Sequence, residues 1–162
     1  GLCGEPGSGK TTLLLAVANH ILSQRFPVLY FQHREEFDRI KAFNFHDADE
    51  VYERVKTFPG LVVWDDLLKT TQRDEQGNRK IAPWEADATW TIINYRIFKD
   101  LPIAFSTEWT PAQLINFDRS LAGRLIERAH DRVVTFRLTR EEVEAGMDPI
   151  TTFDHRFMRR ED

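Results

Sequence analysis

Short, uninterrupted apolar runs recur along the chain, and longer segments with apolar residues at helical spacing separate them. Such runs are typical of buried strands. They lie at Val28–Phe31, Leu61–Trp64 and Ile103–Thr107, with an alternating run at Val133–Leu138. A further strand is expected at Gly1–Cys3, just before a glycine-rich loop, and it is so short that we expect it to be truncated.

The segments between these runs predict helices, because their apolar residues repeat at three- and four-residue spacing and their starts carry capping residues. The expected helices cover 12–19, 34–43, 47–56, 83–100, a segment from Pro111 onward, and 118–130. In the helix opened by Pro83, one face carries Ala86, Trp90, Ile93 and Ile97. Thr110 to Gln113 matches a capping box with proline at the first helical position.

Strands that alternate with helices predict an α/β fold with a parallel sheet covered on both faces. The 162 residues suffice for a single domain. Residues 69–80 are charged and contain a glycine, which predicts a loop. The 24 residues from Thr139 onward are too few for a second domain and predict at most one short helix and a basic tail.

The glycine-rich loop carries the strongest chemical signal. It matches the phosphate-binding pattern G-x-x-x-x-G-K-[ST], in which inward-facing backbone N–H groups and a helix N-terminus hold phosphates. The lysine reaches the β- and γ-phosphate oxygens, and the following hydroxyl ligates Mg²⁺. The predicted nucleotide-binding residues are Gly4, Glu5, Pro6, Gly7, Ser8, Gly9, Lys10, Thr11 and Thr12. The chain is therefore predicted to bind a nucleoside triphosphate.

Two carboxylates end the apolar run at Leu61–Trp64. Asp65 is placed to hold Mg²⁺, directly or through water, together with the hydroxyl of Thr11. Asp66 is placed to polarise the attacking water. The alternative is a surface turn that happens to carry two acids. Because aspartate is one methylene shorter than the glutamate common at the second position, we expect weak turnover.

Polar residues also end the run at Ile103–Thr107. Ser106 and Thr107 would lie beside the phosphate loop, where a hydroxyl can reach the γ-phosphate or its water. The alternative is ordinary polarity at a strand end.

Two arginines stand four residues apart on the helix expected at 118–130. Arg124 and Arg128 repel each other at that spacing unless an anion lies opposite. The anion can be a phosphate bound by a neighbouring subunit, as for an arginine finger. Glu127, Asp131 or solvent can serve equally well.

Charge and composition limit the kinds of partner that the chain can bind. A net charge of −4 excludes a nucleic-acid footprint over the whole surface, so any DNA contact would come from local basic clusters such as Arg73–Lys80 and His155–Arg160. No apolar run is long enough to cross a bilayer, so no membrane partner is expected. A single cysteine, Cys3, fits a reducing cytoplasm.

The order of these motifs resembles the bacterial helicase loaders of the DnaC/DnaI type, with the IstB transposition ATPases as near relatives. Many enzymes share the phosphate loop alone. The combination of that loop with Asp65–Asp66, the Ile92–Arg96 segment and the arginine pair is what points to this family. The matching stretches are Gly4–Asn19, Val63–Leu67, Trp84–Glu85, Ile92–Arg96, Leu101–Ile103, Ser106–Thr107, Thr110–Pro111, Gly123–Arg124 and Arg128.

The resemblance implies a three-layer P-loop NTPase fold of the AAA+ type, with strand order 5-1-4-3-2 and no helical lid domain. It implies ATP and Mg²⁺ as cofactors, ATP-dependent assembly into a homo-oligomer, and delivery of a hexameric replicative helicase onto single-stranded DNA, in a bacterial cytoplasm or phage-infected cell. Ser106 and Thr107 then fall in the segment that senses the γ-phosphate, and Arg124 and Arg128 in the arginine-finger segment. The chain would be the C-terminal ATPase part of a longer protein.

The sequence departs from that family at two positions. Glu108 replaces the sensor asparagine, where its charge would repel a γ-phosphate and Thr107 would have to substitute, and Leu68 replaces a glycine. Asp66 and Glu108 favour an alternative function, a nucleotide-dependent adaptor that switches with ATP but hydrolyses little. A small-molecule kinase would need an acceptor pocket and an arginine-rich lid, and an ABC-type ATPase would need a Ser-Gly-Gly signature; neither pattern is present.

Overall fold

The computed structural model describes residues 1–42, 46, 48–77, 79–129 and 132–136. The tail predicted after Thr139, its basic cluster His155–Arg160 and the predicted absence of a lid fall outside these residues. So do His130 and Asp131.

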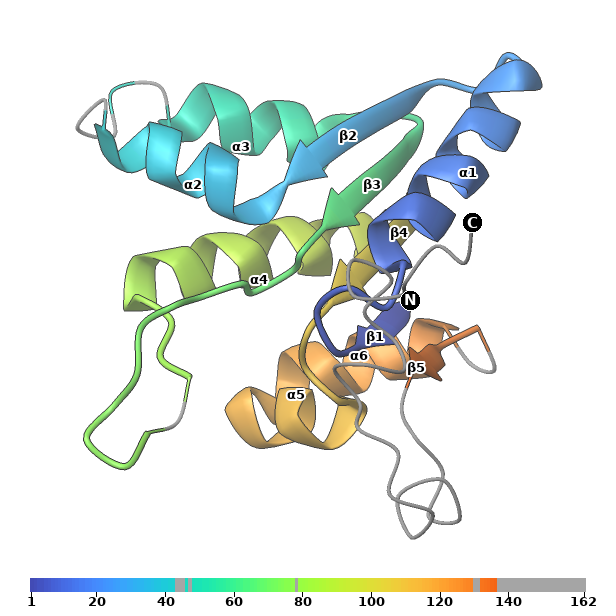
Figure 1. The fold of residues 1–162 in the computed structure, drawn as a ribbon. Coiled ribbons are helices and arrows are strands. Elements are labelled where there is room, and N and C mark those ends of the chain that lie inside the picture. The colour runs from blue at the N-terminus through green and yellow to red at the C-terminus, as the bar shows by residue number, and fades with distance from the viewer. Residues whose placement is uncertain (43–45, 47, 78, 130–131, 137–162) are drawn as a thin grey trace, which may run out of the picture.

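The described strands form one five-stranded parallel sheet (Figure 1). They are β1 (Leu2–Gly4), β2 (Val28–Gln32), β3 (Leu61–Asp65), β4 (Ile103–Thr107) and β5 (Val134–Phe136). Their order across the sheet is β2-β3-β4-β1-β5, which is the predicted order 5-1-4-3-2 read from the other edge. The predicted α/β, three-layer P-loop fold of the AAA+ type is therefore confirmed.

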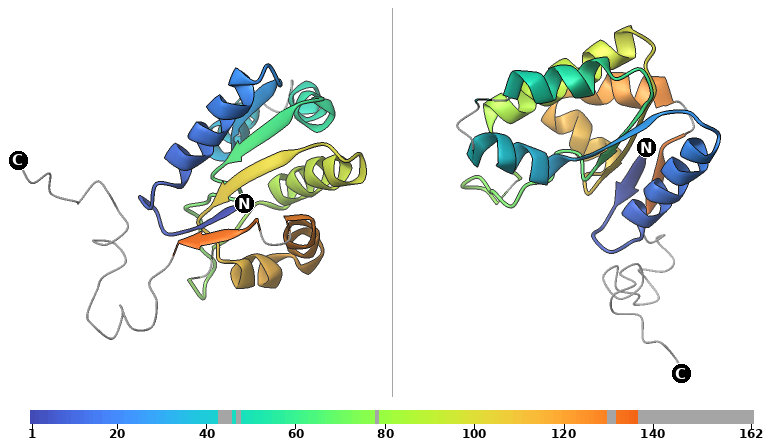
Figure 2. Two further views of the ribbon diagram at one scale, coloured as in Figure 1. Left: turned by 90° about the vertical axis from the view of Figure 1, so that its right-hand side faces the viewer. Right: turned by 90° about the horizontal axis from the view of Figure 1, so that it is seen from above.

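Helices cover both faces of the sheet (Figure 2). The described helices are α1 (Lys10–Ser23), α2 (His33–Ala42), α3 (Ala48–Thr57), α4 (Pro83–Phe98), α5 (Pro111–Phe117) and α6 (Arg119–Ala129). Helix α1 lies on one face, while α3, α4 and α6 lie together on the other. No helix in the described residues is long and apolar enough to span a membrane.

Strand β3, which has β2 on one side and β4 on the other, shows that the sheet is buried on both faces. All five of its residues are buried, and their side chains alternate between the faces. Leu61 and Val63 pack with Leu14 of α1, whereas Val62 and Trp64 belong to the larger core beneath α4. An uninterrupted apolar run is therefore what this position requires.

The most buried face of α4 differs from the apolar stripe seen in the sequence. Of that stripe only Ile93 is fully buried, while Ala86, Trp90 and Ile97 are partly buried at the flank of the core. The remaining buried positions are Thr89, Ile92 and Arg96. Two polar side chains, Thr89 and Arg96, therefore face the core. Arg96 has a structural role there.

The guanidinium of Arg96 is fully buried and donates to five backbone carbonyl oxygens. They belong to Val55, Lys56, Phe58, Gly60 and Pro102. Burial lowers the pKa of Arg96 to about 10, which still leaves the group charged at neutral pH. The guanidinium therefore caps the C-terminal end of α3 and ties it to the starts of β3 and β4.

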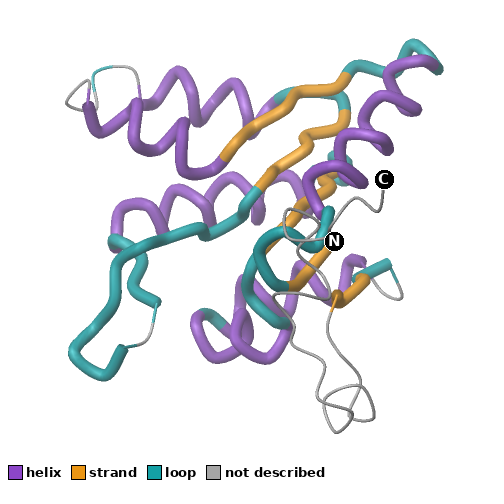
Figure 3. The backbone as a smooth tube through the Cα atoms, viewed as in Figure 1, coloured by secondary structure: helices purple, strands orange, loops and turns teal. Residues whose placement is uncertain are grey.

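Loops and caps mostly follow the sequence prediction. Thr110 and Gln113 form both halves of the capping box at the start of α5. The carboxylate of Asp118 accepts from the backbone N–H groups of Ser120 and Leu121 and so caps α6. The charged segment after β3 is a long loop that folds back on itself, and one antiparallel bridge joins Arg73 and Arg79 (Figure 3).

Candidate nucleotide-binding site

The predicted phosphate loop joins β1 to α1 at the carboxyl end of the sheet. Three of its glycines, Gly4, Gly7 and Gly9, have positive φ angles that favour glycine. Gly4 has φ +150, and a Cβ there would stand 2.6 Å from the carbonyl oxygen of Phe136. Gly9 has φ 82 at the cap of α1, a left-handed conformation that favours glycine. The loop thus turns sharply enough to aim the first N–H groups of α1 at an anion.

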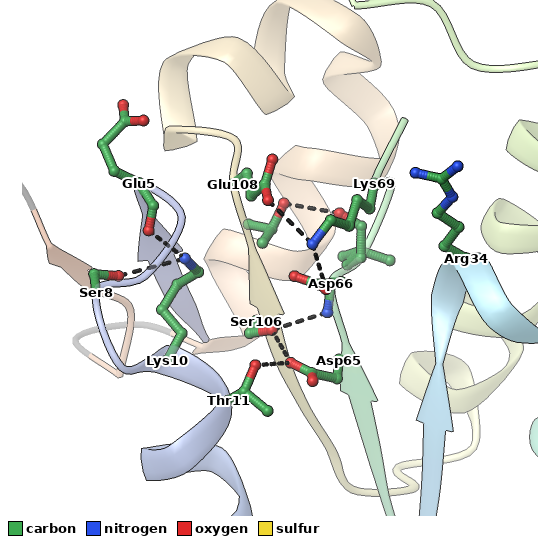
Figure 4. Close-up of polar contacts among 12 residues, drawn as sticks. Glu5, Ser8, Lys10, Thr11, Arg34, Asp65, Asp66, Lys69, Ser106 and Glu108 are labelled. Carbon is green, nitrogen blue, oxygen red and sulfur yellow. Dashed lines mark hydrogen bonds and ion pairs between the residues drawn. The ribbon is translucent and has the colours of Figure 1, made fainter. Parts of the chain in front are cut away.

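Lys10 lies inside this loop. Its ammonium donates to the carbonyl oxygens of Gly4 at 2.9 Å and Glu5 at 2.7 Å, with Ser8 Oγ at 3.4 Å (Figure 4). Burial lowers the pKa of Lys10, and the negative charges of Glu108 and Asp66 oppose that shift. The two carboxylates therefore favour the charged form of Lys10, which is the form that binds phosphate.

Thr11 and Asp65 meet across the sheet edge, as the sequence predicts. The hydroxyl of Thr11 donates to Asp65 Oδ1 at 3.1 Å. Two oxygens in neighbouring positions on an octahedral Mg²⁺ would be about 3.0 Å apart, given metal–oxygen distances near 2.1 Å. The pair fits a magnesium ion that keeps most of its other ligands as water and phosphate. Thr11 and Asp65 are the residues that would hold it.

Two further hydroxyls fix the carboxylate of Asp65, which is buried. Ser106 donates to Oδ1 and Tyr30 donates to Oδ2, the latter at 2.7 Å. Burial raises the pKa of Tyr30, and its bond to Asp65 raises it further, so the phenol stays protonated and remains a donor. Asp65 is thus held in one orientation by strands on both sides of β3.

Asp66 leaves the strand in a different direction. Its φ of 56 turns the chain away from β3, and its backbone N–H donates to Ser106 Oγ at 2.9 Å. The carboxylate is paired with Lys69, whose ammonium lies 2.8 Å from Oδ2. The second acid of the predicted pair is therefore near the site but is engaged by a cation that the sequence analysis did not assign.

The same turn explains the departure at Leu68. Leu68 has φ 59, a conformation that costs a residue other than glycine about 1–2 kcal/mol. Its side chain is fully buried, which offsets that cost. A glycine would meet the backbone requirement at this position without the side-chain contacts.

Two neighbouring residues at the end of β4, Ser106 and Thr107, make different contacts. Ser106 contacts Asp65, as described above. The hydroxyl of Thr107 instead donates to the carbonyl oxygen of Leu67 at 2.8 Å and accepts from the N–H of Trp109 at 3.2 Å. Thr107 therefore fixes the two loops that flank the site, and a direct contact with the γ-phosphate stays a prediction.

Glu108, at the position where the family resemblance expects an asparagine, is not an isolated charge. Lys69 lies 3.2 Å from one of its oxygens and Arg79 lies 3.4 Å from the other. Both cations come from the loop at 69–80, one from each end. The repulsion expected between Glu108 and a phosphate is therefore reduced by two neighbouring positive charges.

The two arginines of α6 do not join this site within one chain. Arg124 donates to the side-chain oxygen of Asn94, and its guanidinium lies 6.0 Å from the centroid of the Trp90 ring. Arg128 pairs with Asp100, which precedes β4 and so lies at the end of the sheet opposite the phosphate loop. Both partners of that pair are mostly exposed, so the ion pair contributes little to stability.

Several contacts of this region were missed in the sequence. Tyr30 contacts Asp65, Lys69 contacts Asp66, and Arg79 contacts Glu108. Nothing in the sequence around Tyr30, Lys69 or Arg79 indicates these contacts. His33 and Glu85 form a further buried contact at 2.9 Å, and His33 Nδ1 accepts from the indole N–H of Trp64. The Trp84–Glu85 stretch noted in the sequence thus has a packing role beside the site.

Comparisons with known proteins give relatives of the chain and structures with a similar fold. No family model matches the chain. The Bacillus subtilis protein described as phage-like element PBSX protein XkdC is 33% identical over 137 residues, covering 84% of this chain and 49% of XkdC. The chain therefore spans about half the length of the curated relatives it matches.

Solved structures show the fold. DnaI is 25% identical with a TM-score of 0.60, over 85% of this chain and 71% of DnaI. The DnaC helicase loader is 20% identical with a TM-score of 0.57, over 84% of this chain and 76% of DnaC. DnaA bound to AMPPCP and single-stranded DNA is 16% identical with a TM-score of 0.62, over 91% of this chain and 45% of DnaA. The resemblance to loaders of the DnaC/DnaI type is thus confirmed.

Proposed function

We propose that this AAA+ P-loop domain, similar in fold to the DnaC and DnaI helicase loaders, binds MgATP, hydrolyses it slowly, and acts in loading a replicative helicase onto single-stranded DNA. One observation carries the proposal. Lys10, Thr11 and Asp65 converge at the carboxyl edge of the sheet, although 54 residues separate Thr11 from Asp65. A lysine, a hydroxyl and a carboxylate are the groups that hold a triphosphate and its metal.

The chemistry assigned to these residues is phosphoryl transfer to water. Lys10 and the loop N–H groups bind the β- and γ-phosphates, while Thr11 and Asp65 would hold Mg²⁺, which neutralises charge on the phosphate oxygens. The oxygen of water bonds to the γ-phosphorus as the bond from that phosphorus to the bridging oxygen breaks. Asp66 orients the water and accepts its proton.

A second candidate function rests on the pairing of Asp66 with Lys69. One oxygen of the Asp66 carboxylate accepts from the Lys69 ammonium at 2.8 Å, so it can contact a water only after that pair opens. The domain would then act as a nucleotide-dependent adaptor that switches on binding ATP and turns over little. Steady-state ATP hydrolysis with and without single-stranded DNA separates the two functions, with Lys10→Ala as the blank. Stimulation by DNA supports a loader ATPase, and turnover at the level of the blank in both conditions supports the adaptor.

We further propose that ATP bridges neighbouring copies of the chain through Arg128 or Arg124. The position of Arg128, exposed and remote from its own phosphate loop, supports a role toward a neighbour. Arg128→Ala should bind ATP normally as a monomer but lose stimulated hydrolysis and ATP-dependent assembly.

Mixing variants tests that geometry. Arg128→Ala subunits combined with Lys10→Ala subunits should recover part of the activity, because the intact site of one meets the intact arginine of the other. The same experiment with Arg124→Ala decides which arginine acts. If neither arginine variant recovers activity with Lys10→Ala at any ratio, although all variants are folded, Arg124 and Arg128 are ordinary solvent-exposed residues of α6.

A further inference from the structure

We propose that Lys69 is the residue that distinguishes ATP from ADP: it binds the γ-phosphate and, in doing so, releases the carboxylate of Asp66. This inference rests on the proposed nucleotide site and adds to it a binding residue outside the recognised motifs. It also gives a reason why a glutamate can stand at position 108.

The backbone places Lys69 firmly beside the site. Its N–H donates to the carbonyl oxygen of Asp66 at 2.9 Å, which closes a tight turn directly after β3. The two residues inside the turn, Leu67 and Leu68, are fully buried, and the N–H of Leu67 donates to the carbonyl oxygen of Ser106 at 2.7 Å. A fixed turn thus carries a long side chain whose tip is free to change partners.

The ammonium of Lys69 has capacity for one more acceptor. It can donate three hydrogen bonds. In the described residues it meets Asp66 at 2.8 Å and Glu108 at 3.2 Å, and its side chain is 33% exposed. Burial lowers the pKa of Lys69, but the bond to Asp66 and the charges of both acids outweigh it and raise the pKa overall. The group therefore stays a cation, which is the state that binds phosphate.

Its position relative to Lys10 puts that charge within range of the phosphates. Lys10 follows the phosphate loop after β1, and Lys69 follows the turn after β3, so both side chains lie at the carboxyl edge of the parallel sheet. Figure 4 shows the Lys69 ammonium lying over Asp66 and directed toward the side on which Lys10 and the phosphate loop lie. A γ-phosphate held by Lys10 would draw Lys69 away from Asp66, because a phosphate offers more negative charge than a single carboxylate.

Glu108 and Arg79 complete the arrangement. Glu108 is 13% exposed and is held by Lys69 and Arg79 together. When Lys69 turns toward a phosphate, Arg79 still neutralises Glu108, and Asp66 is the carboxylate that becomes free to act on the water. The guanidinium of Arg79 lies 5.5 Å from the centroid of the Trp109 ring, and in the described residues it pairs with Glu108 and not with Asp66. Arg79 therefore serves as the comparison: it is a cation on the same acid, Glu108, but without the contact to Asp66 that Lys69 makes.

The test compares the affinities of AMPPCP and ADP by calorimetry in the presence of Mg²⁺. Lys69→Met keeps the aliphatic stem and removes the charge. It should weaken AMPPCP binding by about 10- to 100-fold, the equivalent of one charge-assisted hydrogen bond, and change ADP binding little. Lys69→Arg should keep most of the preference. Arg79→Met removes the second cation on Glu108 and should shift the ratio of the two affinities by less than Lys69→Met does, because Arg79 is not proposed to contact the phosphate.

The outcomes separate this inference from the proposed function. Equal weakening of both nucleotides in Lys69→Met, or a shift in the ratio as large in Arg79→Met, would overturn the role of Lys69. If the wild-type chain binds neither nucleotide, the nucleotide site itself is wrong. Thermal melting of each variant controls for folding, which Lys69→Met should preserve because the lysine tip is partly exposed.

Discussion

Replacing Arg96 by alanine should be among the most destabilising single changes in this fold. The guanidinium bonds to five carbonyl oxygens while contacting no carboxylate among the described residues. Three of the carbonyls lie at or just after the end of α3, where helical partners run out. Val55 has Pro59 four residues later, which has no N–H, so no helical bond can replace the lost one.

The magnitude follows from counting the carbonyls that lose a donor. The oxygen of Pro102 keeps the N–H of Val62 at 3.2 Å, so it is the least affected. Each buried carbonyl left without a donor costs about 1–3 kcal/mol, and water entering the space recovers part of that loss. A net loss of about 3–5 kcal/mol is expected, a large share of the roughly 5–15 kcal/mol that stabilises an ordinary domain.

Urea unfolding measures this loss directly. With an m-value of about 2 kcal/mol/M, the midpoint of Arg96→Ala should fall by about 2 M. Arg96→Lys should fall by less, because one ammonium can reach some of the carbonyls but not all five. Arg119→Ala, an exposed arginine on α6, is the control and should change stability by no more than about 0.5 kcal/mol. A loss in Arg96→Ala no greater than in that control would refute the capping role.

Two further predictions concern the site and its DNA contact. Asp66→Asn should keep MgATP binding but lower turnover, since an amide cannot accept the proton, whereas Asp65→Asn should weaken the dependence on Mg²⁺; identical behaviour of the two variants in both assays would reject the division of roles. Single-stranded DNA should bind weakly through local basic clusters such as Arg73–Lys80, with an affinity that falls with salt at a slope of only a few phosphates; salt-independent binding or a preference for duplex would contradict this.

The sequence predicted the elements that local chemistry determines. The phosphate loop has a fixed spacing, and the acids after Leu61–Trp64 follow a run that only a central strand would carry, so both were recognisable without coordinates. The order of the strands could be predicted only through the resemblance to helicase loaders. Leu68 stood out as a departure, and the structure supplies the reason in its φ of 59.

What the sequence could not predict depends on which side chains meet across the fold. Tyr30 reaches Asp65 because β2 pairs with β3 in a register that sets Gln32 opposite Asp65. Lys69 reaches Glu108 because a turn after β3 comes back over the end of β4. Arg96 looked like part of an amphipathic helix, since nothing local distinguishes a buried arginine from an exposed one. These contacts join segments that are far apart in the sequence. The spacing of apolar residues, from which helices and strands were predicted, carries no information about them.

The central claim, that Lys10 and its loop bind ATP, is tested most directly by titrating ATP and Mg²⁺ into the wild-type chain and into Lys10→Ala. The wild type should bind one ATP per chain, and the variant should lose at least about 100-fold in affinity, because the cation aimed at the phosphates is gone. Lys80→Ala, in the loop on the other side of the site, should bind as the wild type does. Unchanged ATP affinity in a folded Lys10→Ala protein would contradict the assignment of the phosphate loop.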